Sequence, residues 1–189
     1  MKKLFFLLLF SIPSLCISAN SENFLSIFDL TATTGYVWQS DSHFKQVYGK
    51  GIQDVITIDG CYWPFRHFGI GIQGSYWLAN GKTTILKKST RLWEVPLNLY
   101  LEGRIGQMFQ LHGSLGTGII FVNEKSYLGS VSHQAWSGEA EVGIDYYFFK
   151  KSYLSAALQY LYSGKEISET QERVALGGLN LRAGIGISF

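Results

Sequence analysis

Hydrophobic and polar residues alternate along residues 175–189, the last fifteen of the chain, and do so one by one from residue 178 onward. Odd positions carry mostly leucine and isoleucine and end on Phe189, whereas even positions carry glycine, Asn180, Arg182 and Ser188. Because successive side chains of a strand point to opposite sides, these two sets lie on opposite faces of one strand. The pattern is typical of a strand that has lipid on one side and a narrow polar lumen on the other.

A similar alternation recurs along the rest of the chain and predicts eight strands in all. They cover residues 26–38, 54–63, 69–78, 91–104, 110–122, 138–149, 153–162 and 175–189. A tilted strand needs about 9–11 residues to cross a membrane, and each segment is long enough. An even number of antiparallel strands also closes without an edge. We therefore expect an all-β fold, a closed eight-stranded antiparallel transmembrane β-barrel with an up-and-down meander.

The connections between these strands alternate in length. Short connections are expected at residues 64–68, 105–109 and 150–152, and long ones at residues 39–53, 81–90, 123–137 and 163–174. Short periplasmic turns and longer external loops are usual in outer-membrane barrels, and this arrangement places both termini in the periplasm.

Aromatic residues on the predicted outward face gather at the two ends of the strands. Those near the long connections are Tyr36, Trp38, Tyr76, Trp93, Phe121, Tyr160 and Tyr162. Those near the short turns are Phe28, Tyr62, Tyr146, Phe148 and Phe189. The outward positions between them are mainly aliphatic, as expected for two aromatic girdles at the membrane interfaces.

The last strand also carries a short motif. Arg182, Gly184, Ile187 and Phe189 match a polar–x–Gly–x–x–hydrophobic–x–aromatic pattern. In this pattern the chain resembles the small outer-membrane β-barrels of Gram-negative bacteria, the OmpA/OmpX-type membrane domains and the opacity-like, porin-related barrels. The resemblance covers essentially all of the chain after its leader. It implies that the barrel-assembly machinery reads this signal, and it implies nothing about what the folded barrel does.

The first residues have the features of a secretory leader. Lys2 and Lys3 precede an apolar run that is too short to span a membrane, and Ala19 offers a small residue for cleavage. We therefore expect a signal peptide at residues 1–19 and one barrel domain at residues 20–189. No wall-binding domain of the longer OmpA type follows Phe189, so wall anchoring of that kind is not expected.

Charge and cysteine content narrow the possible partners. The formal charge of +2 falls to zero when Lys2 and Lys3 leave with the leader, so no nucleic-acid partner is expected. Cys61 is then the one remaining cysteine, which excludes an internal disulfide. It is interpreted as a small inward-facing residue, with an intermolecular cross-link as the alternative.

The predicted inward face is polar, which argues against a lipocalin-like calyx with an apolar interior. Its charged members form a candidate lumen network. They are Asp29, Asp59, Glu94, Glu102, Arg104, His112, Glu139, Glu141, Asp145 and Arg182. We expect Glu102, His112 and Asp145 at a similar height, and Arg182 close to Asp29. Since buried charges are costly unless paired, ionic clusters should plug the lumen. A wet path lined by the excess acid would instead prefer cations.

Catalytic chemistry finds little support in the chain. The four histidines are scattered without metal-ligand spacing, so no catalytic residue, metal or cofactor is expected. Some barrels of the resembled class are lipid A deacylases or palmitoyltransferases. The nearest collection of suitable residues is Ser132, His133, Ser137 and Glu139. However, Ala135 stands where the deacylase H-x-S arrangement has its serine, which argues against that activity.

One long connection is strongly basic: Lys82, Lys87, Lys88 and Arg91 occur without an acid among them. Contact with lipopolysaccharide phosphates or an acidic host surface is one interpretation, and a solvated loop is the other. The sequence thus favours an outer-membrane barrel with a role in envelope integrity or surface adhesion. The alternatives are a narrow cation-preferring channel and a lipid A-modifying enzyme. Expected partners are outer-membrane lipid or lipopolysaccharide, the assembly machinery and a host-surface ligand.

Overall fold

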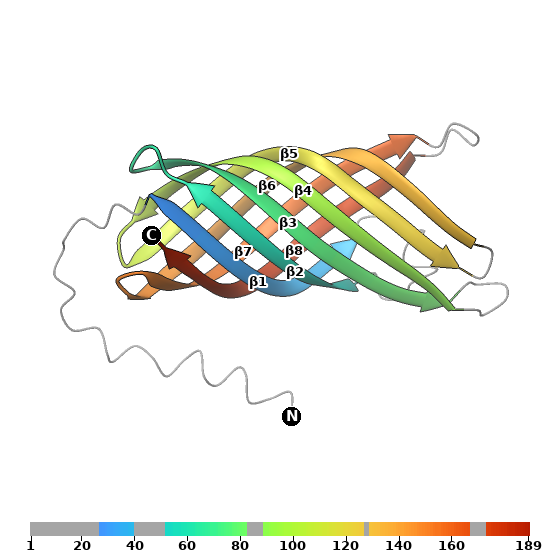
Figure 1. Ribbon diagram of the computed structural model, residues 1–189, viewed down its shortest axis with the longest axis horizontal. Helices are drawn as coiled ribbons and strands as arrows, with labels where there is room; N and C mark the ends of the chain where they lie inside the picture. The colour runs from blue at the N-terminus through green and yellow to red at the C-terminus, as the bar shows by residue number, and fades with distance from the viewer. Residues whose placement is uncertain (1–26, 40–51, 83–88, 127–128, 167–172) are drawn as a thin grey trace, which may run out of the picture.

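The chain forms a closed β-barrel in which every strand pairs with its neighbours in sequence (Figure 1). The computed structural model describes residues 27–39, 52–82, 89–126, 129–166 and 173–189. Within these ranges eight strands follow one another. They are β1 (Phe28–Gln39), β2 (Ile52–Tyr62), β3 (Phe68–Lys82), β4 (Ser89–Gly106), β5 (Phe109–Ser126), β6 (Gly129–Phe149), β7 (Ser152–Glu166) and β8 (Arg173–Ser188). Each neighbouring pair is antiparallel, and β1 pairs with β8, which confirms the predicted fold class.

Both ends of the barrel chain lie at the same end of the cylinder (Figure 1). The backbone N–H of Ile27 donates to the carbonyl of Phe189 at 2.8 Å, and the rings of Phe28 and Phe189 lie 6.4 Å apart. The β2–β3, β4–β5 and β6–β7 turns are at this end too, since they follow the register of these strands. We call it the short-turn end. The predicted signal peptide at residues 1–19 lies outside the described residues.

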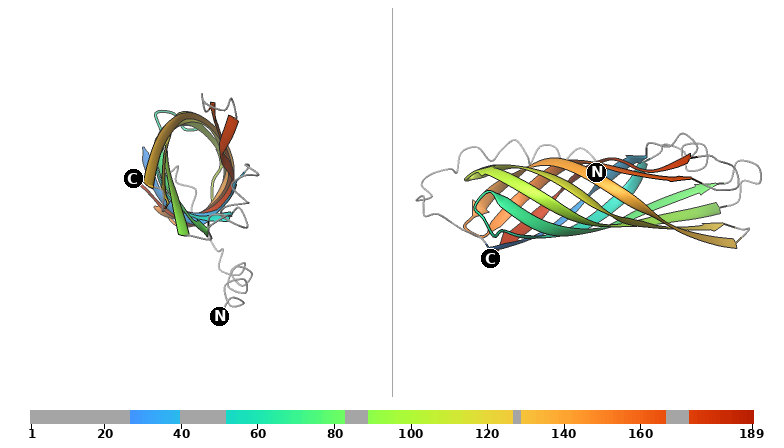
Figure 2. Two further views of the ribbon diagram at one scale, coloured as in Figure 1. Left: turned by 90° about the vertical axis from the view of Figure 1, so that its right-hand side faces the viewer. Right: turned by 90° about the horizontal axis from the view of Figure 1, so that it is seen from above.

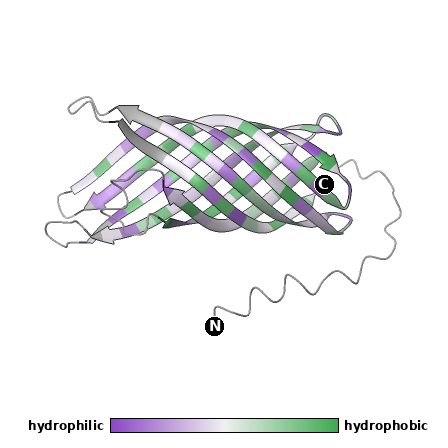
Figure 3. Cartoon of the chain, turned by 180° about the vertical axis from the view of Figure 1, so that it is seen from behind, coloured by the Kyte–Doolittle hydropathy of each residue, from purple (hydrophilic) through white to green (hydrophobic). Residues whose placement is uncertain are grey.

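The alternation of the sequence becomes an inward and an outward face on every strand. Figure 3 shows hydrophobic and hydrophilic residues succeeding one another along the strands. Outward aliphatic side chains are bare in the isolated chain, with Leu115 70% exposed. Water-soluble monomers rarely expose so continuous an apolar surface, whereas a lipid-facing wall requires it. Among the residues that the structure describes, no helix is long and apolar enough to cross a membrane.

One predicted connection is wrong. Residues 123–137, expected as a long loop, belong largely to β5 and β6, which pair from Ser126↔Gly129 downward. Both faces of this hairpin extension are mostly polar, with Val131 and Trp136 as exceptions, so the regular hydrophobic period that reveals the other strands is missing. The cross-strand hydrogen bond from Asn123 Nδ2 to Ser132 Oγ, 2.8 Å, accompanies the backbone pairing. Beyond Gly138↔Tyr162, β6 continues without a register partner on β7.

Two local features shape the wall. The pairing of β3 with β4 is interrupted between Gly74↔Leu97 and Trp77↔Glu94, although the register is the same on both sides. Pro96 lies in this gap and has no N–H to donate. A bulge between Tyr147 and Phe149 shifts the β6 register. As a result Phe148 and Phe149 are both exposed, which adds to the aromatic ring at the short-turn end.

The interior of the barrel has three layers rather than one polar core. An apolar cluster lies toward the long-connection end. It consists of Val37, Val55, Trp77, Ala79, Leu92, Ile120, Val122 and Leu161. A second cluster of Cys61, Trp63 and Tyr100 lies nearer the short-turn end. Polar and charged side chains fill the space between them. The view along the barrel in Figure 2 shows the ring of strands that encloses these layers.

Candidate functional site

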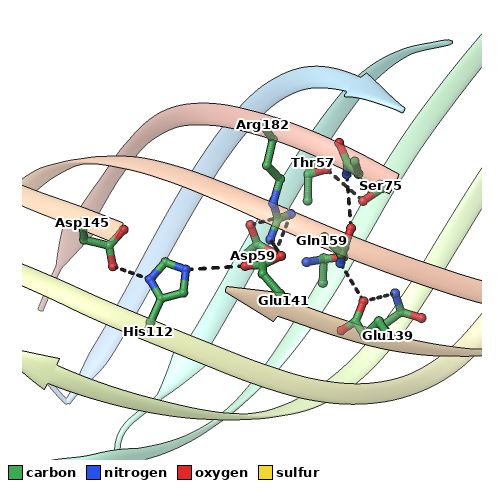
Figure 4. Close-up of polar contacts among 12 residues, drawn as sticks. Thr57, Asp59, Ser75, His112, Glu139, Glu141, Asp145, Gln159 and Arg182 are labelled. Carbon is green, nitrogen blue, oxygen red and sulfur yellow. Dashed lines mark hydrogen bonds and ion pairs between the residues drawn. The ribbon is translucent and has the colours of Figure 1, made fainter. Parts of the chain in front are cut away.

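The middle layer contains a chain of charged side chains contributed by four strands (Figure 4). Arg182 of β8 hydrogen-bonds Glu141 of β6 through Nη2, and its Nη1 lies 3.4 Å from the Asp59 carboxylate of β2. Glu141 lies 3.6 Å from Nε2 of His112, whose Nδ1 lies 3.0 Å from Asp145. We call these five residues the ionic chain. Arg182 and His112 each face two carboxylates, so no member of the chain is buried without a partner.

A separate ion pair lies toward the short-turn end. Arg104 Nη1 donates to Asp29 Oδ2 at 2.9 Å, and the Arg104 guanidinium lies 3.6 Å above the Trp63 ring. The expectation that Arg182 lies close to Asp29 is therefore wrong. Arg182 is the register partner of Gly35, whereas Asp29 pairs with Ser188. Six residues along β1, about 20 Å at the rise of an extended strand, separate the two backbone positions. The Arg182 side chain lines the same cavity as Asp29 but forms its ion pairs with Asp59 and Glu141.

Amide side chains and the carboxyl group of Glu139 extend the polar layer toward the long-connection end. Glu139 Oε2 accepts hydrogen bonds from Asn98 Nδ2 at 2.5 Å and Gln159 Nε2 at 2.8 Å. Gln159 also donates to Gln73 at 2.7 Å and accepts from Asn180 at 3.1 Å. These contacts cross the lumen and tie strands together that are not neighbours in the sheet, such as β3 and β7.

The remaining predicted members of the network lie inside the barrel as well. Glu94 is 1% exposed and accepts a hydrogen bond of 3.0 Å from Gln39 Nε2. Its register partners are Trp77 and Val122 of the apolar cluster, so this carboxyl group lies within that layer. Glu102 lines the internal cavity beside the ionic chain. The structure thus divides the predicted network into the ionic chain, the Arg104–Asp29 pair, the two hydrogen-bonded glutamates Glu94 and Glu139, and Glu102 at the cavity.

The internal cavity is small. It measures about 30 Å³ and is lined by polar groups that include Asp29, Asp145 and Arg182. Such a volume holds about two water molecules. Oδ1 of Asp29 and Oδ1 of Asp145 are buried acceptors without a protein hydrogen-bond partner. Each of these two atoms can accept a hydrogen bond from a water molecule. Above the cavity the apolar cluster narrows the lumen further, with Trp77 and Ile120 both 0% exposed.

Sequence reasoning missed this apolar cluster. Its members occupy inward positions at the strand ends near the long connections, beyond the polar stretch from which the lumen was inferred. The same period of two, followed to the strand ends, indicates them, since Val37, Val55 and Trp77 share the parity of inward residues on their strands.

The four residues considered for hydrolysis are not brought together. Ser132 and His133 are exposed on the protruding β5–β6 hairpin, where Ser132 accepts the hydrogen bond from Asn123. Ser137 and Glu139 are buried inside the barrel. There the Ser137 hydroxyl donates to Asn98 Oδ1 at 3.0 Å, and Glu139 is occupied by two amides. A nucleophile and its base need direct contact, and these residues do not offer it.

The four basic residues of the predicted second long connection are also divided, between two strands and residues outside the described ranges. Lys82 and Arg91 belong to β3 and β4, and Arg91 is exposed. Lys87 and Lys88 lie outside the described residues. Of the assembly motif, Arg182 belongs to the ionic chain, whereas Gly184, Ile187 and Phe189 follow it along β8 to the short-turn end.

Comparison with known proteins gives the class of this barrel. No protein-family model and no curated protein matches the chain. The structure is similar to that of Neisserial surface protein A, at 15% identity and a TM-score of 0.64, over 87% of this chain and 98% of that one. It is similar to OprG from Pseudomonas aeruginosa, at 14% identity and a TM-score of 0.61, over 86% of this chain and 95% of that one. Ail of Yersinia pestis matches at 15% identity and a TM-score of 0.53, over 86% of this chain and 99% of that one.

At these identities the likeness concerns the fold. The chain has the fold of the small eight-stranded outer-membrane barrels, as its sequence resemblance implied.

Proposed function

We propose that this protein is an integral outer-membrane barrel that conducts no ions and catalyses no reaction. Its role lies in surface adhesion or envelope integrity, carried by the segments at the long-connection end. The short-turn end, with both termini, faces the periplasm, and the barrel-assembly machinery inserts the chain. The observation that carries the proposal is the filled interior: two apolar clusters and a paired ionic chain leave a cavity of about 30 Å³.

A pore needs a continuous wet path, and the three layers of this lumen oppose one. An eight-stranded barrel has room for side chains and little else. The cross-lumen contacts of Arg182, Glu139 and Gln159 occupy the centre. The apolar cluster then lies between this layer and the long-connection end. A hydrated ion would have to break buried ion pairs and pass a dry constriction, each of which is costly.

A narrow cation-preferring channel is the second candidate, and the sign of the inward charge favours it. Seven inward acids face two arginines and His112. Motion of the apolar cluster would be required to connect this acidic layer with the outside.

Conductance separates the two candidates. The mature chain is refolded, its folding is verified by the mobility shift between unheated and heated samples on a denaturing gel, and single-channel currents are recorded in planar bilayers. A porin in the same bilayers establishes the sensitivity. We expect no discrete steps at any salt concentration. Cation-preferring steps that Glu139→Gln abolishes, and that Glu124→Gln on the protruding hairpin leaves intact, would replace the proposal by a channel.

An anionic surface ligand is the form of adhesion that the sequence favours. The Ail neighbour is an attachment invasion locus protein whose structure contains the heparin analogue sucrose octasulfate. Lys87 and Lys88 supply adjacent positive charges between β3 and β4 in this chain. Proteoliposomes should bind immobilised heparin, and Lys87→Gln/Lys88→Gln should weaken this binding. The matched control Lys150→Gln/Lys151→Gln removes the same charge from the β6–β7 turn and should bind normally. Equal binding by all three proteins would remove this role.

A further inference from the structure

The exposed ionisable side chains of the short-turn end are basic. Arg66 and His67 are exposed on the β2–β3 turn, and Lys150 and Lys151 are exposed on the β6–β7 turn. No described acid is exposed at this end, and Asp29, which lies at the start of β1, is buried inside the barrel. Figure 1 shows both turns at the end of the cylinder that holds the C-terminus. We call them the basic turns.

Exposed aromatic rings accompany the cations on both basic turns. On the β2–β3 turn, Phe65 directly precedes Arg66, and Phe68 follows it two residues later. On the β6–β7 turn, the bulge leaves both Phe148 and Phe149 exposed, with ring centroids 5.1 Å apart, immediately before the two lysines. Aromatic rings on the outside of a barrel mark the depth of the lipid headgroups. The basic side chains therefore start at the level where the phosphate groups of a lipid leaflet lie.

The third turn of this end, between β4 and β5, carries an aromatic ring without a charge. Residues 105–110 read Ile-Gly-Gln-Met-Phe-Gln. The exposed ring of Phe109 stacks on that of Tyr146, with centroids 4.8 Å apart. The aromatic girdle therefore does not require a neighbouring cation, and the charges of the two basic turns need an explanation of their own.

Hydrogen bonds to the backbone hold both basic turns against the barrel. The carbonyl of Arg66 accepts from Arg104 Nε at 3.4 Å, and the carbonyl of His67 accepts from the backbone N–H of Arg104 at 3.0 Å. The carbonyl of Lys151 accepts from the backbone N–H of Ser188 at 2.8 Å. The basic side chains thus start from fixed positions, so less backbone entropy is lost when they bind an anion.

The positions of the basic turns favour a lipid leaflet over a soluble anion. The β2–β3 and β6–β7 turns are four strands apart in a closed ring of eight, so they lie on opposite sides of the barrel. A small soluble anion could contact one of them at a time, whereas a leaflet surrounds the barrel and reaches both. Lysine and arginine beside a membrane surface attract anionic lipid headgroups, and their long stems reach toward the headgroup region.

We propose that the basic turns bind anionic phospholipid headgroups in the leaflet at the short-turn end. The guanidinium of Arg66 binds two phosphate oxygens of one headgroup, and the ammonium groups of Lys150 and Lys151 add mobile positive charges for another. That this leaflet is the periplasmic one rests on the orientation proposed above. The binding itself uses neither the lumen nor the long connections, so its failure would leave the proposed function unchanged.

Spin-labelled lipids test the proposed preference. The full barrel is reconstituted into phosphatidylcholine bilayers with a trace of spin-labelled phosphatidylglycerol or spin-labelled phosphatidylcholine. Electron paramagnetic resonance then measures the fraction of each lipid that is immobilised at the barrel wall. At low salt we expect phosphatidylglycerol to associate at least about twofold more strongly than phosphatidylcholine, and high salt should weaken this preference. Arg66→Gln/Lys150→Gln/Lys151→Gln, with folding verified by gel mobility, should bind both lipids equally.

Two single lysines, each added to this triple variant, separate position from net charge. Gln107→Lys places a positive charge beside Phe109 on the third turn and should restore part of the preference. Val131→Lys adds the same charge to the protruding β5–β6 hairpin. This position shares the inward parity of the buried Ser137 on β6, so it faces away from the surrounding lipid and should restore nothing.

Three results would overturn the proposal. An unchanged preference in the triple variant would show that other parts of the wall select the lipid. Equal restoration by Gln107→Lys and Val131→Lys would show that net charge alone decides. Loss of the wild-type preference when soluble glycerol phosphate is added at the concentration of the anionic lipid would assign the basic turns to a soluble anion.

Discussion

Replacement of Arg182 by methionine should destabilise the barrel more than most single substitutions. Arg182 is 4% exposed, hydrogen-bonds Glu141 and lies 3.4 Å from Asp59. Methionine keeps much of the stem volume, so the change removes the charge while leaving only a small cavity. Two carboxylates then remain buried, and of the ionic chain only His112 stays beside one of them, 3.6 Å from Glu141.

The size of the effect follows from the cost of a broken buried ion pair. Such a loss destabilises a protein by about 3–5 kcal/mol, because the remaining charge is neither hydrated nor paired. For a domain of this size 1 kcal/mol shifts the melting temperature by about 2–4 °C, which gives a decrease of roughly 6–20 °C. Refolding in vitro avoids any effect of this residue on the assembly signal.

Urea unfolding of the refolded protein in micelles measures the change, with thermal melting as a second measure. Arg66→Met, at an exposed position of the β2–β3 turn, is the control and should change stability little. Arg182→Met/Asp59→Asn should be more stable than Arg182→Met, because the second substitution removes the carboxylate that had its ion pair with Arg182, whereas Glu141 keeps His112 beside it. If Arg182→Met unfolds at the wild-type urea concentration, the ionic chain does not hold the strands together and the reasoning fails.

Three smaller predictions concern other parts of the interior. Gly186 lies under the Tyr153 ring of its register partner, so Gly186→Ala should displace that ring and break its 2.6 Å hydrogen bond to Thr31, at a cost of about 1–3 kcal/mol in urea unfolding. Gly138→Ala is the control, since an added Cβ there meets no atom within 4 Å; an equal loss in both would contradict the packing argument. Cys61 is 4% exposed, so a water-soluble thiol reagent should modify it only after unfolding. Rapid labelling of the folded barrel would instead show that the short-turn end is open to solvent. Trp63→Leu should lower the free energy of unfolding by about 0.5–2 kcal/mol, because it removes the cation–π contact with Arg104. Trp136→Leu on the outer surface is the control, and an equal effect of both substitutions would count against that contact.

The strand pattern was predictable because each residue of a membrane barrel wall faces one of two very different environments. All ten residues of the proposed lumen network lie on the inward face, since a period of two decides the side of every residue once a strand is recognised. The prediction was wrong where the two environments are alike. On the β5–β6 extension both faces meet water, so residues 123–137 carry no alternation although they form strand.

Partners inside the lumen were harder to infer than the faces. Arg182 and Asp29 are on adjacent strands, and the sequence suggested that they meet. Their register offsets them by six residues, so Arg182 contacts Asp59 and Glu141, and Asp29 contacts Arg104. Arg182 and Asp59 belong to strands that are not paired with each other, and a contact across the lumen depends on how the tilted wall closes.

The sequence by itself determined the number of strands, their inward and outward faces and the aromatic rings at both ends. These features follow from an alternation of side chains that is local in the sequence, because every second residue of a strand faces lipid. Only the tertiary structure decided which charges pair across the lumen and that an apolar cluster lies above them. It alone also set Arg91 opposite Lys125 on the wall. Those features depend on register and closure, which bring residues far apart in the chain to one level of the barrel.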